Sequence, residues 1–290
     1  MSRPERELVR LQSDHLELEL LPKLGGRWHR LRAFGHDLLR TPQDLDAYGA
    51  EPFFWGGFVM APWCNRVTAG PQEVAGGLVD LPANFPDGTA IHGQVHDLAW
   101  DVAGPGALRV AAGGDGWPWR YEVTQRIDVD GPRLRLALAL TNEDAQPMPA
   151  GLGIHPWFVR PLEMELHADR VFCSNTESPL SPEPVGAAHD LRALREMPRD
   201  LDATWTDLGH PEVARLRWPA PGVVASMRIS PEARYLCAAS PRSVPAVAVE
   251  PQTHAPDGLR RLANGEVGGL RLLQPGSTLQ LTVELEFSRA

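Results

Sequence analysis

Hydrophobic and polar residues alternate along much of this chain. The alternation is clearest at 16–20, 134–140 and 279–287. A period of two places one set of side chains against a core and the other toward water, as half-buried antiparallel strands require. Further strands are predicted at 107–112, 213–218, 223–229 and 246–250. The pattern therefore predicts a protein built mainly of antiparallel sheet.

The connecting segments support the same architecture. Residues 121–142 are predicted to form a hairpin whose turn, at 128–132, contains an Asp-Gly-Pro sequence. Only two short helices are predicted, at 201–208 and 256–262. Glycine and proline are spread between the strands rather than concentrated in a linker, and no tandem repeat is present. We expect one all-β domain over residues 1–290, an antiparallel sandwich whose loops carry the chemistry.

Composition and charge narrow the class of protein. The chain has 290 residues, 43% hydrophobic and 22% charged, which is typical of a globular domain. It contains no apolar run near the ~18 residues of a membrane span, and no secretory signal is visible. The net charge of −9 argues against a nucleic-acid partner. Cys64, Cys173 and Cys237 are far apart and form no CxxC pair, so we expect a cytoplasmic protein.

Several familiar catalytic motifs are absent from the sequence. It contains no Walker loop, no complete dinucleotide fingerprint, no GxSxG elbow and no HExxH. His92 and His96 are four residues apart, with His155 and Glu250 as further possible ligands. However, His92 lies in a glycine-flanked loop and not on a helix, where this spacing would align two ligands. The expectation is that no metal is bound.

Polar, aromatic and glycine residues gather in several segments, as expected around a ligand pocket. These segments are 53–58, 61–67, 91–94, 151–158, 201–205 and 247–254. Taken singly, Arg66 is also compatible with a surface ion pair, His155 with a turn cap and Asp202 with a helix N-cap. Glu250 is different, because it ends an apolar strand and precedes a proline. Partial burial there would raise its pKa and prepare it to act as a base.

The order of short motifs along the chain is more specific than any one of them. The motifs are Gly25-Gly26, Pro62-Trp63-Cys64-Asn65-Arg66, His92-Gly93, Pro118-Trp119-Arg120-Tyr121, Gly153-Ile154-His155-Pro156-Trp157-Phe158 and Glu250-Pro251-Gln252-Thr253. Over nearly the whole chain they resemble the aldose 1-epimerase family, also called galactose mutarotases. Trp157 stands where that family most often has tyrosine, and the segment around Asp202 matches a Leu-Asp-x-x-aromatic pattern only loosely. The resemblance implies an antiparallel β-supersandwich.

Aldose epimerisation sets clear chemical requirements. A base removes the proton of the anomeric hydroxyl while an acid protonates the ring oxygen, and the ring opens. After rotation about the bond from the first carbon to the second, the same two groups transfer the protons back and the ring closes. This calls for one carboxylate and one imidazole, expected on opposite sides of the sugar, with no metal and no organic cofactor. The resemblance implies Glu250 as the base and His155 as the acid.

The remaining pocket residues are assigned to binding. The resemblance implies that Arg66, His92 and Asp202 hold hydroxyl groups, with Asn65 beside Arg66. Arginine suits this task because it offers several fixed donors and does not titrate. Trp157 is expected under the apolar face of the pyranose or in the core. The expected partner is a small-molecule sugar, and the expected state is a monomer or weak homodimer.

Three alternative functions remain open at the level of sequence. A mutarotase for a phosphorylated or sulfonated sugar would need extra arginines at the pocket rim, for which Arg160 and Arg242 are the candidates. A non-catalytic carbohydrate-binding protein would need neither an acid nor a base, so the presence of both Glu250 and His155 argues against it. A glycoside hydrolase would use paired carboxylates, but only Glu250 is placed at a strand end.

Overall fold

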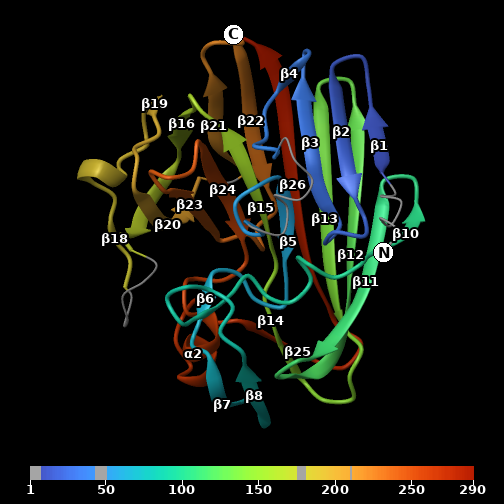
Figure 1. The fold of residues 1–290 in the computed structure, drawn as a ribbon. Coiled ribbons are helices and arrows are strands. Elements are labelled where there is room, and N and C mark those ends of the chain that lie inside the picture. The colour runs from blue at the N-terminus through green and yellow to red at the C-terminus, as the bar shows by residue number, and fades with distance from the viewer. Residues whose placement is uncertain (1–7, 43–50, 175–180, 210) are drawn as a thin grey trace.

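Two large antiparallel sheets form most of the molecule (Figure 1). The structure is a computed structural model, and it describes residues 8–42, 51–174, 181–209 and 211–290. In spatial order, the larger sheet contains β1 (Val9–Gln12), β2 (Leu16–Leu21), β3 (Arg27–Ala33), β5 (Gly57–Met60), β15 (Gly153–Val159), β24 (Ala246–Gln252), β23 (Tyr235–Ser240), β20 (Leu201–Leu208), β17 (Ala168–Phe172) and β18 (Glu183–Pro184), with β4 (His36–Asp37) paired to β3.

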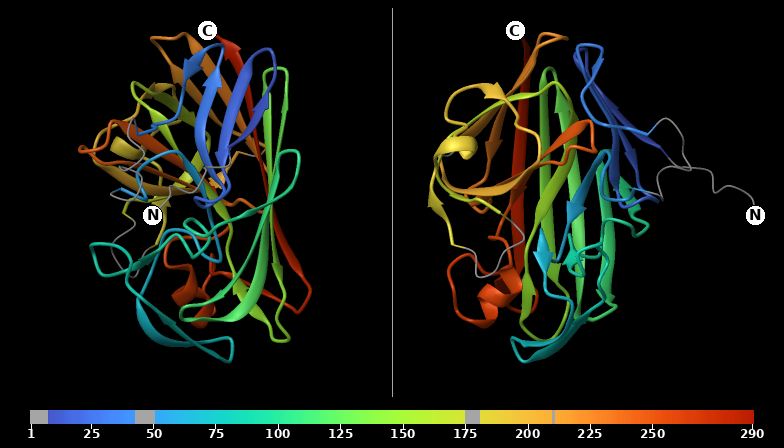
Figure 2. Two further views of the ribbon diagram at one scale, coloured as in Figure 1. Left: turned by 45° about the vertical axis from the view of Figure 1, so that its right-hand side comes forward. Right: turned by 60° about the vertical axis from the view of Figure 1, so that its left-hand side comes forward.

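The second sheet forms the other layer of the molecule, as the two turned views show (Figure 2). In spatial order it contains β10 (Asp101–Gly104), β11 (Ala107–Gly114), β12 (Trp117–Asp130), β13 (Arg133–Asn142), β26 (Thr278–Arg289), β22 (Val223–Ile229), β21 (Glu212–Trp218), β16 (Glu163–Leu166) and β19 (Arg195–Glu196). The smaller elements are the strand pairs β6 (Arg66–Val67) with β9 (Ala90–Ile91), β7 (Gly70–Val74) with β8 (Gly77–Leu81) and β14 (Met148–Ala150) with β25 (Arg271–Leu273), and the helices η1 (Ala187–His189) and α2 (Gly258–Ala263).

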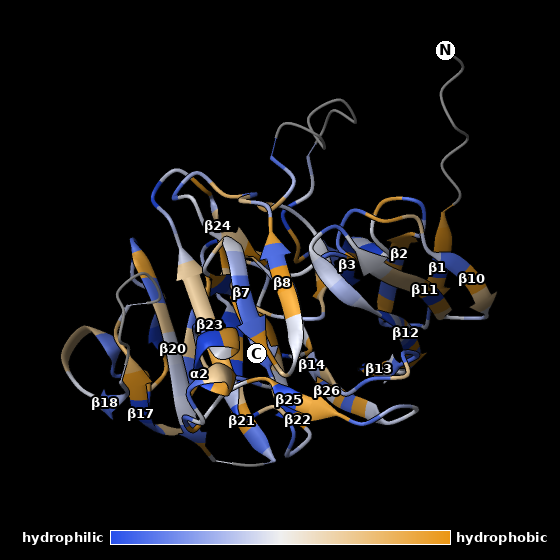
Figure 3. Cartoon of the chain, turned by 90° about the horizontal axis from the view of Figure 1, so that it is seen from below, coloured by the Kyte–Doolittle hydropathy of each residue, from blue (hydrophilic) through white to orange (hydrophobic). Residues whose placement is uncertain are grey.

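The expected antiparallel sandwich is confirmed. Hydrophobic and hydrophilic residues follow one another along the strands, as Figure 3 shows. In β13 and β26 the apolar members of each alternation are buried and the polar members face outward. The two sheets are joined through their inner faces, where the Trp28 indole donates a hydrogen bond to Gln125 Oε1 at 3.0 Å. The hairpin of β12 and β13 and the helix near 256–262 also form, the latter as α2.

Residues 201–208 form strand β20, so the helix predicted there is wrong. The strand pairs with β17 on one side and β23 on the other. Leu201, Ala203 and Trp205 alternate with polar residues and are buried against the core. The β-branched Thr204 and Thr206 also favour a strand, so both the period and the propensity of this segment were those of a sheet.

The central strands β15 and β24 are buried on both faces. One face of each packs in the main core, through residues such as Phe158 and Val249. The opposite face belongs to a second, separate cluster that includes Phe58, Trp157 and Ala248. Loops therefore cover the outer face of the larger sheet at its centre. Polar side chains on this face are enclosed between the sheet and the loops. Within the described residues, no helix combines the length and the apolar character needed to cross a membrane.

Candidate active site

The enclosed face of the larger sheet contains a cavity of about 340 Å³. This volume is at the lower end of the range for ligand pockets, and it suits a ligand about the size of one sugar ring. One part of the wall is apolar and is formed by Phe53, Phe54, Phe85, Ile91 and Trp157. All seven residues predicted from the sequence line this cavity: Asn65, Arg66, His92, His155, Trp157, Asp202 and Glu250.

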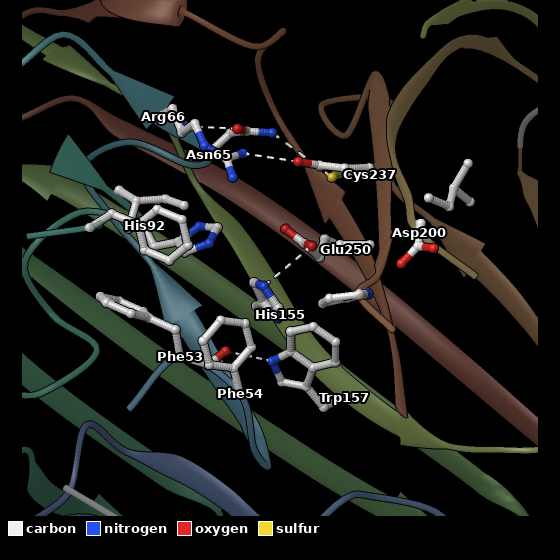
Figure 4. Close-up of a pocket in the computed structure, with 16 residues that line it drawn as sticks. Phe53, Phe54, Asn65, Arg66, His92, His155, Trp157, Asp200, Cys237 and Glu250 are labelled. Carbon is white, nitrogen blue, oxygen red and sulfur yellow. Dashed lines mark hydrogen bonds and ion pairs between the residues drawn. The ribbon is translucent and has the colours of Figure 1, made fainter. Parts of the chain in front are cut away.

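His155 and Glu250 lie side by side at the floor of the cavity (Figure 4). They belong to the neighbouring strands β15 and β24, whose register is the same before and after this point and therefore sets the two residues opposite each other. His155 Nε2 is 3.3 Å from Glu250 Oε1, and the residues are 3% and 1% exposed. The expectation that the two groups flank the sugar from opposite sides is wrong, because adjacent strands of one sheet present them together.

The structure also corrects three interpretations of these residues that were based on the sequence. His155 lies within β15 and does not cap a turn. Asp202 lies within β20 and is not a helix N-cap. Glu250 is inside β24, which continues through Pro251 to Gln252, so its carboxylate is enclosed rather than placed at the end of a strand.

Burial moves the pKa values of the pair in opposite directions. The pKa of Glu250 is raised to about 8, chiefly because burial disfavours the charged carboxylate and also because Asp202 is negative. Burial lowers the pKa of His155 to about 3, and the positive charges of Arg27 and His96 act in the same direction. At neutral pH the pair therefore holds a single proton and carries no net charge. Because the two groups are in contact, their titration belongs to the pair rather than to either residue.

His92 reaches the same cavity from a tight loop. Its backbone is in the left-handed region, with φ of 62°, and Gly93 follows with φ of 75°. A Cβ atom at Gly93 would lie 2.0 Å from the carbonyl oxygen of Ala61, so only glycine permits this approach of the loop to the end of β5. The ring of His92 then packs edge-on against His155, with centroids 4.8 Å apart. The His-Gly motif thus places an imidazole against His155 at the floor of the cavity.

Arg66 is held between two carboxylates. Its Nε is 2.7 Å from Asp87 Oδ2, and its Nη1 is 3.2 Å from Asp202 Oδ2. Its guanidinium also lies over the ring of Phe85, at 5.2 Å from the centroid. Asn65 precedes it and accepts a hydrogen bond from the Arg66 backbone amide through its own Oδ1 at 2.8 Å. These contacts fix the side chains of Arg66 and Asn65 at the cavity wall. The ion pair that the sequence allowed for Arg66 does form, but it lies at the wall of the cavity.

Trp157 is oriented by its indole nitrogen, which donates a hydrogen bond to the carbonyl oxygen of Phe53 at 2.6 Å (Figure 4). Its ring is tilted against Phe54 and His155, with centroid distances of 5.7 and 5.1 Å. The aromatic ring forms part of the cavity wall, and its only polar atom is already engaged. The side chain therefore offers the ligand an apolar surface.

The two candidate rim arginines are both engaged elsewhere. Arg160 donates to the carbonyl oxygens of Met197 and Pro198, at 2.8 Å each, and does not line the cavity. Arg242 is paired with Asp200, which does line the cavity, and its Nε and Nη2 both donate to Asp200 Oδ2. Of the arginines in the part of the chain that the structure describes, Arg66 is the one that lines the cavity.

Three of these residues could be considered as metal ligands. The ligand atoms of His92, His155 and Glu250 lie within 4.8 Å of one another, and all three side chains are buried. A tetrahedral zinc site holds its ligand atoms about 3.4 Å apart, given bonds of about 2.1 Å. His155 Nε2 and Glu250 Oε1 have this spacing, at 3.3 Å, and the ligand atom of His92 lies within 4.8 Å of both.

Sequence reasoning missed three residues at the site. Asp87 and Asp200 hold the two arginines, and Cys237 lines the cavity beside Glu250. Asp87 belongs to a Pro-Asp-Gly turn and Cys237 to a strand of small apolar residues, so nothing local distinguishes either from a structural residue. Only strand pairing brings Cys237 next to Glu250, since the two residues are register partners.

Comparison with known proteins gives a consistent result. Solved structures with the same fold include a protein of Escherichia coli K12 (21% identity, TM-score 0.82, covering 98% of this chain and 99% of that chain). A galactose mutarotase-like protein from Clostridium acetobutylicum has 15% identity and a TM-score of 0.82, covering 99% and 96% of the two chains. The GalM/aldose epimerase homologue from C. elegans has 16% identity and a TM-score of 0.81, covering 98% and 99%.

At these identities the solved structures establish the fold alone. No curated protein sequence matches the chain. The sequence model of the aldose 1-epimerase family, in contrast, matches residues 7–286, which is nearly the whole length. This chain therefore belongs to the aldose 1-epimerase family, and it is an isomerase that acts on carbohydrates.

Proposed function

We propose that this enzyme interconverts the α and β anomers of a free, uncharged aldohexose, with Glu250 as the base and His155 as the acid. The observation that carries the proposal is the buried contact between these two groups at the floor of a cavity of sugar size. The anomeric oxygen and the ring oxygen are bonded to the same carbon. Two adjacent catalytic groups can therefore serve both oxygens at once.

The reaction needs only one proton on the pair. Ionised Glu250 accepts the proton of the anomeric hydroxyl, while protonated His155 donates its proton to the ring oxygen. The bond between the anomeric carbon and the ring oxygen breaks, a carbonyl forms, and the pair is left as a carboxylic acid and a neutral imidazole. This neutral form is the one that burial favours in the empty cavity. The bond between the first and second carbons then rotates. The two proton transfers run in reverse, and the ring closes to give the other anomer.

The other cavity residues are proposed to bind and orient the sugar. Arg66 and Asp202 together offer donors and an acceptor to neighbouring hydroxyl groups, which is the pattern that vicinal diols need. His92 and Asn65 contribute further polar atoms, and Trp157 provides an apolar surface for one face of the ring. Since the cysteines are present as thiols, we also assign the enzyme to the reducing cytoplasm.

The direct test is anomeric exchange. Purified enzyme is mixed with freshly dissolved α-anomers of several aldohexoses, and the approach to equilibrium is followed by polarimetry and by exchange NMR of the anomeric protons. We expect the rate to rise in proportion to enzyme concentration for at least one sugar. Saturable binding of sugars with no acceleration would support a non-catalytic carbohydrate-binding protein instead.

The pKa shifts predict an unusual pH profile. The one-proton form of the pair is populated above about pH 3, set by His155, and below about pH 8, set by Glu250. We expect kcat/KM, which reports the free enzyme, to be level from about pH 5 to 7 and to fall above about pH 8. Rates are measured at low buffer concentration with the spontaneous reaction subtracted. A fall centred near pH 6.5, the usual value for histidine, would contradict the assigned environment.

Neutral sugars are expected to be better substrates than their 6-phosphates. Among the described residues, the cavity is lined by one guanidinium, that of Arg66, and by the carboxylates of Asp200 and Asp202. Glu250 adds no full negative charge at neutral pH because its pKa is raised to about 8. The two carboxylates still outnumber the guanidinium and repel an anion. We expect a higher kcat/KM for glucose or galactose than for the 6-phosphate, with little dependence on salt. As a comparison, Asp200→Asn releases Arg242 and should narrow the difference. A preference of the wild-type enzyme for the phosphate that fades as salt rises would favour the anionic substrate class.

A further inference from the structure

A row of side chains crosses five adjacent strands of the larger sheet. Strand register sets Phe58 of β5 opposite His155 of β15, and Cys237 of β23 opposite both Glu250 of β24 and, on its other side, Thr204 of β20. The register between β15 and β24 is the same on either side of His155 and Glu250, so these two residues are also opposite each other. This pair connects the two halves of the row. The proposed base thus has the proposed acid on one side and a buried thiol on the other.

The acid end of the row is fixed by an aromatic contact. The rings of Phe58 and His155 are stacked, with centroids 4.5 Å apart and planes 21° from parallel. Phe58 in turn lies against the buried guanidinium of Arg27, which is 4.7 Å from the Phe58 centroid. His155 is therefore held by contacts that do not involve Glu250. Within the described residues, Oε2 of Glu250 is buried without a hydrogen-bond partner of ordinary geometry, so the carboxylate lacks a constraint on the side away from His155.

Cys237 is placed to supply that constraint. It is 2% exposed, lines the same cavity as Glu250, and is the residue directly across from it in the sheet. The amide nitrogen of Asn65 donates to Cys237 Sγ at 3.8 Å. An amide nitrogen is a donor only, so this contact uses sulfur as an acceptor and leaves the thiol proton for another group. Figure 4 shows Asn65, Cys237 and Glu250 on the same wall of the cavity.

We infer that Cys237 is a positioning residue, whose thiol, held by Asn65, donates a hydrogen bond to the Glu250 carboxylate and orients it toward the anomeric hydroxyl. The inference rests on the proposed function for the role of Glu250 as base. Cys237 acts through Glu250 and forms no bond to the substrate. Two further relations agree with it. The thiol lowers the pKa of Glu250, against the larger effect of burial, and Thr204 interacts with Cys237 by a side-chain hydrogen bond.

The thiol donor predicts a specific change in the pH profile. Cys237→Ala removes the donor, so the pKa of Glu250 rises further and the alkaline fall of kcat/KM moves upward by about half to one pH unit. We expect kcat to fall about tenfold, the effect of one hydrogen bond to an ionised group. Cys237→Ser keeps a donor in nearly the same place and should restore both values toward the wild type. An alkaline limb that is the same in Cys237→Ala and the wild type would overturn the inference.

Cys64 provides a matched control. Cys64 is also a fully buried thiol, but it does not line the cavity. Its Sγ contacts the carbonyl oxygen of Met60. Cys64→Ala should therefore leave the position of the alkaline limb unchanged. An equal shift in both variants would mean that loss of any neighbouring thiol moves the limb, and it would overturn the specific role of Cys237.

A second measurement does not depend on catalysis. The S–H stretching band of Cys237 is isolated in the infrared difference spectrum between the wild type and Cys237→Ala. We expect this band to shift as pH rises through the titration of Glu250, and to lose that shift in Glu250→Gln. A band that is insensitive to both changes would overturn the inference. If the wild type accelerates no anomeric exchange, the proposed function fails, and the infrared result still decides whether the thiol binds the carboxylate.

Discussion

Glu250→Gln is expected to lower kcat by about 10²–10⁴-fold, the usual contribution of a positioned general base. Glutamine keeps the size of the side chain but cannot accept the proton of the anomeric hydroxyl. The contact with His155 at 3.3 Å can be retained as a neutral hydrogen bond, and the native carboxylate is itself largely protonated at neutral pH because its pKa is raised to about 8. Stability should therefore change little. Initial rates of anomeric exchange and thermal unfolding measure the two effects.

Glu19 offers a matched control for this substitution. It is a second buried glutamate in the larger sheet, 3% exposed, and its Oε2 is 3.0 Å from His29 Nδ1. It does not line the cavity. Glu19→Gln should lower the melting temperature while leaving kcat close to the wild-type value. Most of the wild-type rate persisting in Glu250→Gln would show that another group is the base.

His155→Asn is expected to produce the second large loss, again about 10²–10⁴-fold in kcat and with a smaller change in KM. In the proposed reaction the imidazole delivers its proton to the ring oxygen only as the ring opens, so removing it should raise the energy of the transition state. Arg66→Ala removes contacts made in the ground state as well, and it should therefore raise KM. Steady-state kinetics with the best aldohexose separates the two patterns.

The control for His155 is the histidine partner of Glu19. His29→Asn removes an imidazole that also contacts a buried carboxylate but does not line the cavity, and kcat should not change. If His155→Asn altered mainly KM while Arg66→Ala altered mainly kcat, the roles of the two residues would have to be exchanged.

Local pattern was sufficient for most of the fold. The alternation at 134–140 and 279–287 predicts β13 and β26, because a period of two specifies a half-buried strand whatever its partner. The segment 201–208 is predicted to be a helix, but its apolar residues alternate and it forms a strand. Its alternation and its β-branched threonines favour a strand, and pairing with β17 and β23 on both sides stabilises that strand as β20. Short segments of this kind depend on tertiary pairing for their final state.

The order of motifs along the chain likewise determined which residues meet in the cavity, but not how they meet. Only the register of β15, β24 and β23 decides that His155 and Cys237 flank Glu250, because strand pairing joins residues far apart in sequence. Only enclosure of that row by the covering loops raises the pKa of Glu250 and lowers that of His155. The sequence by itself determined the residue types and the fold class. The acid–base properties of the pair arise from burial, which exists only in the folded chain.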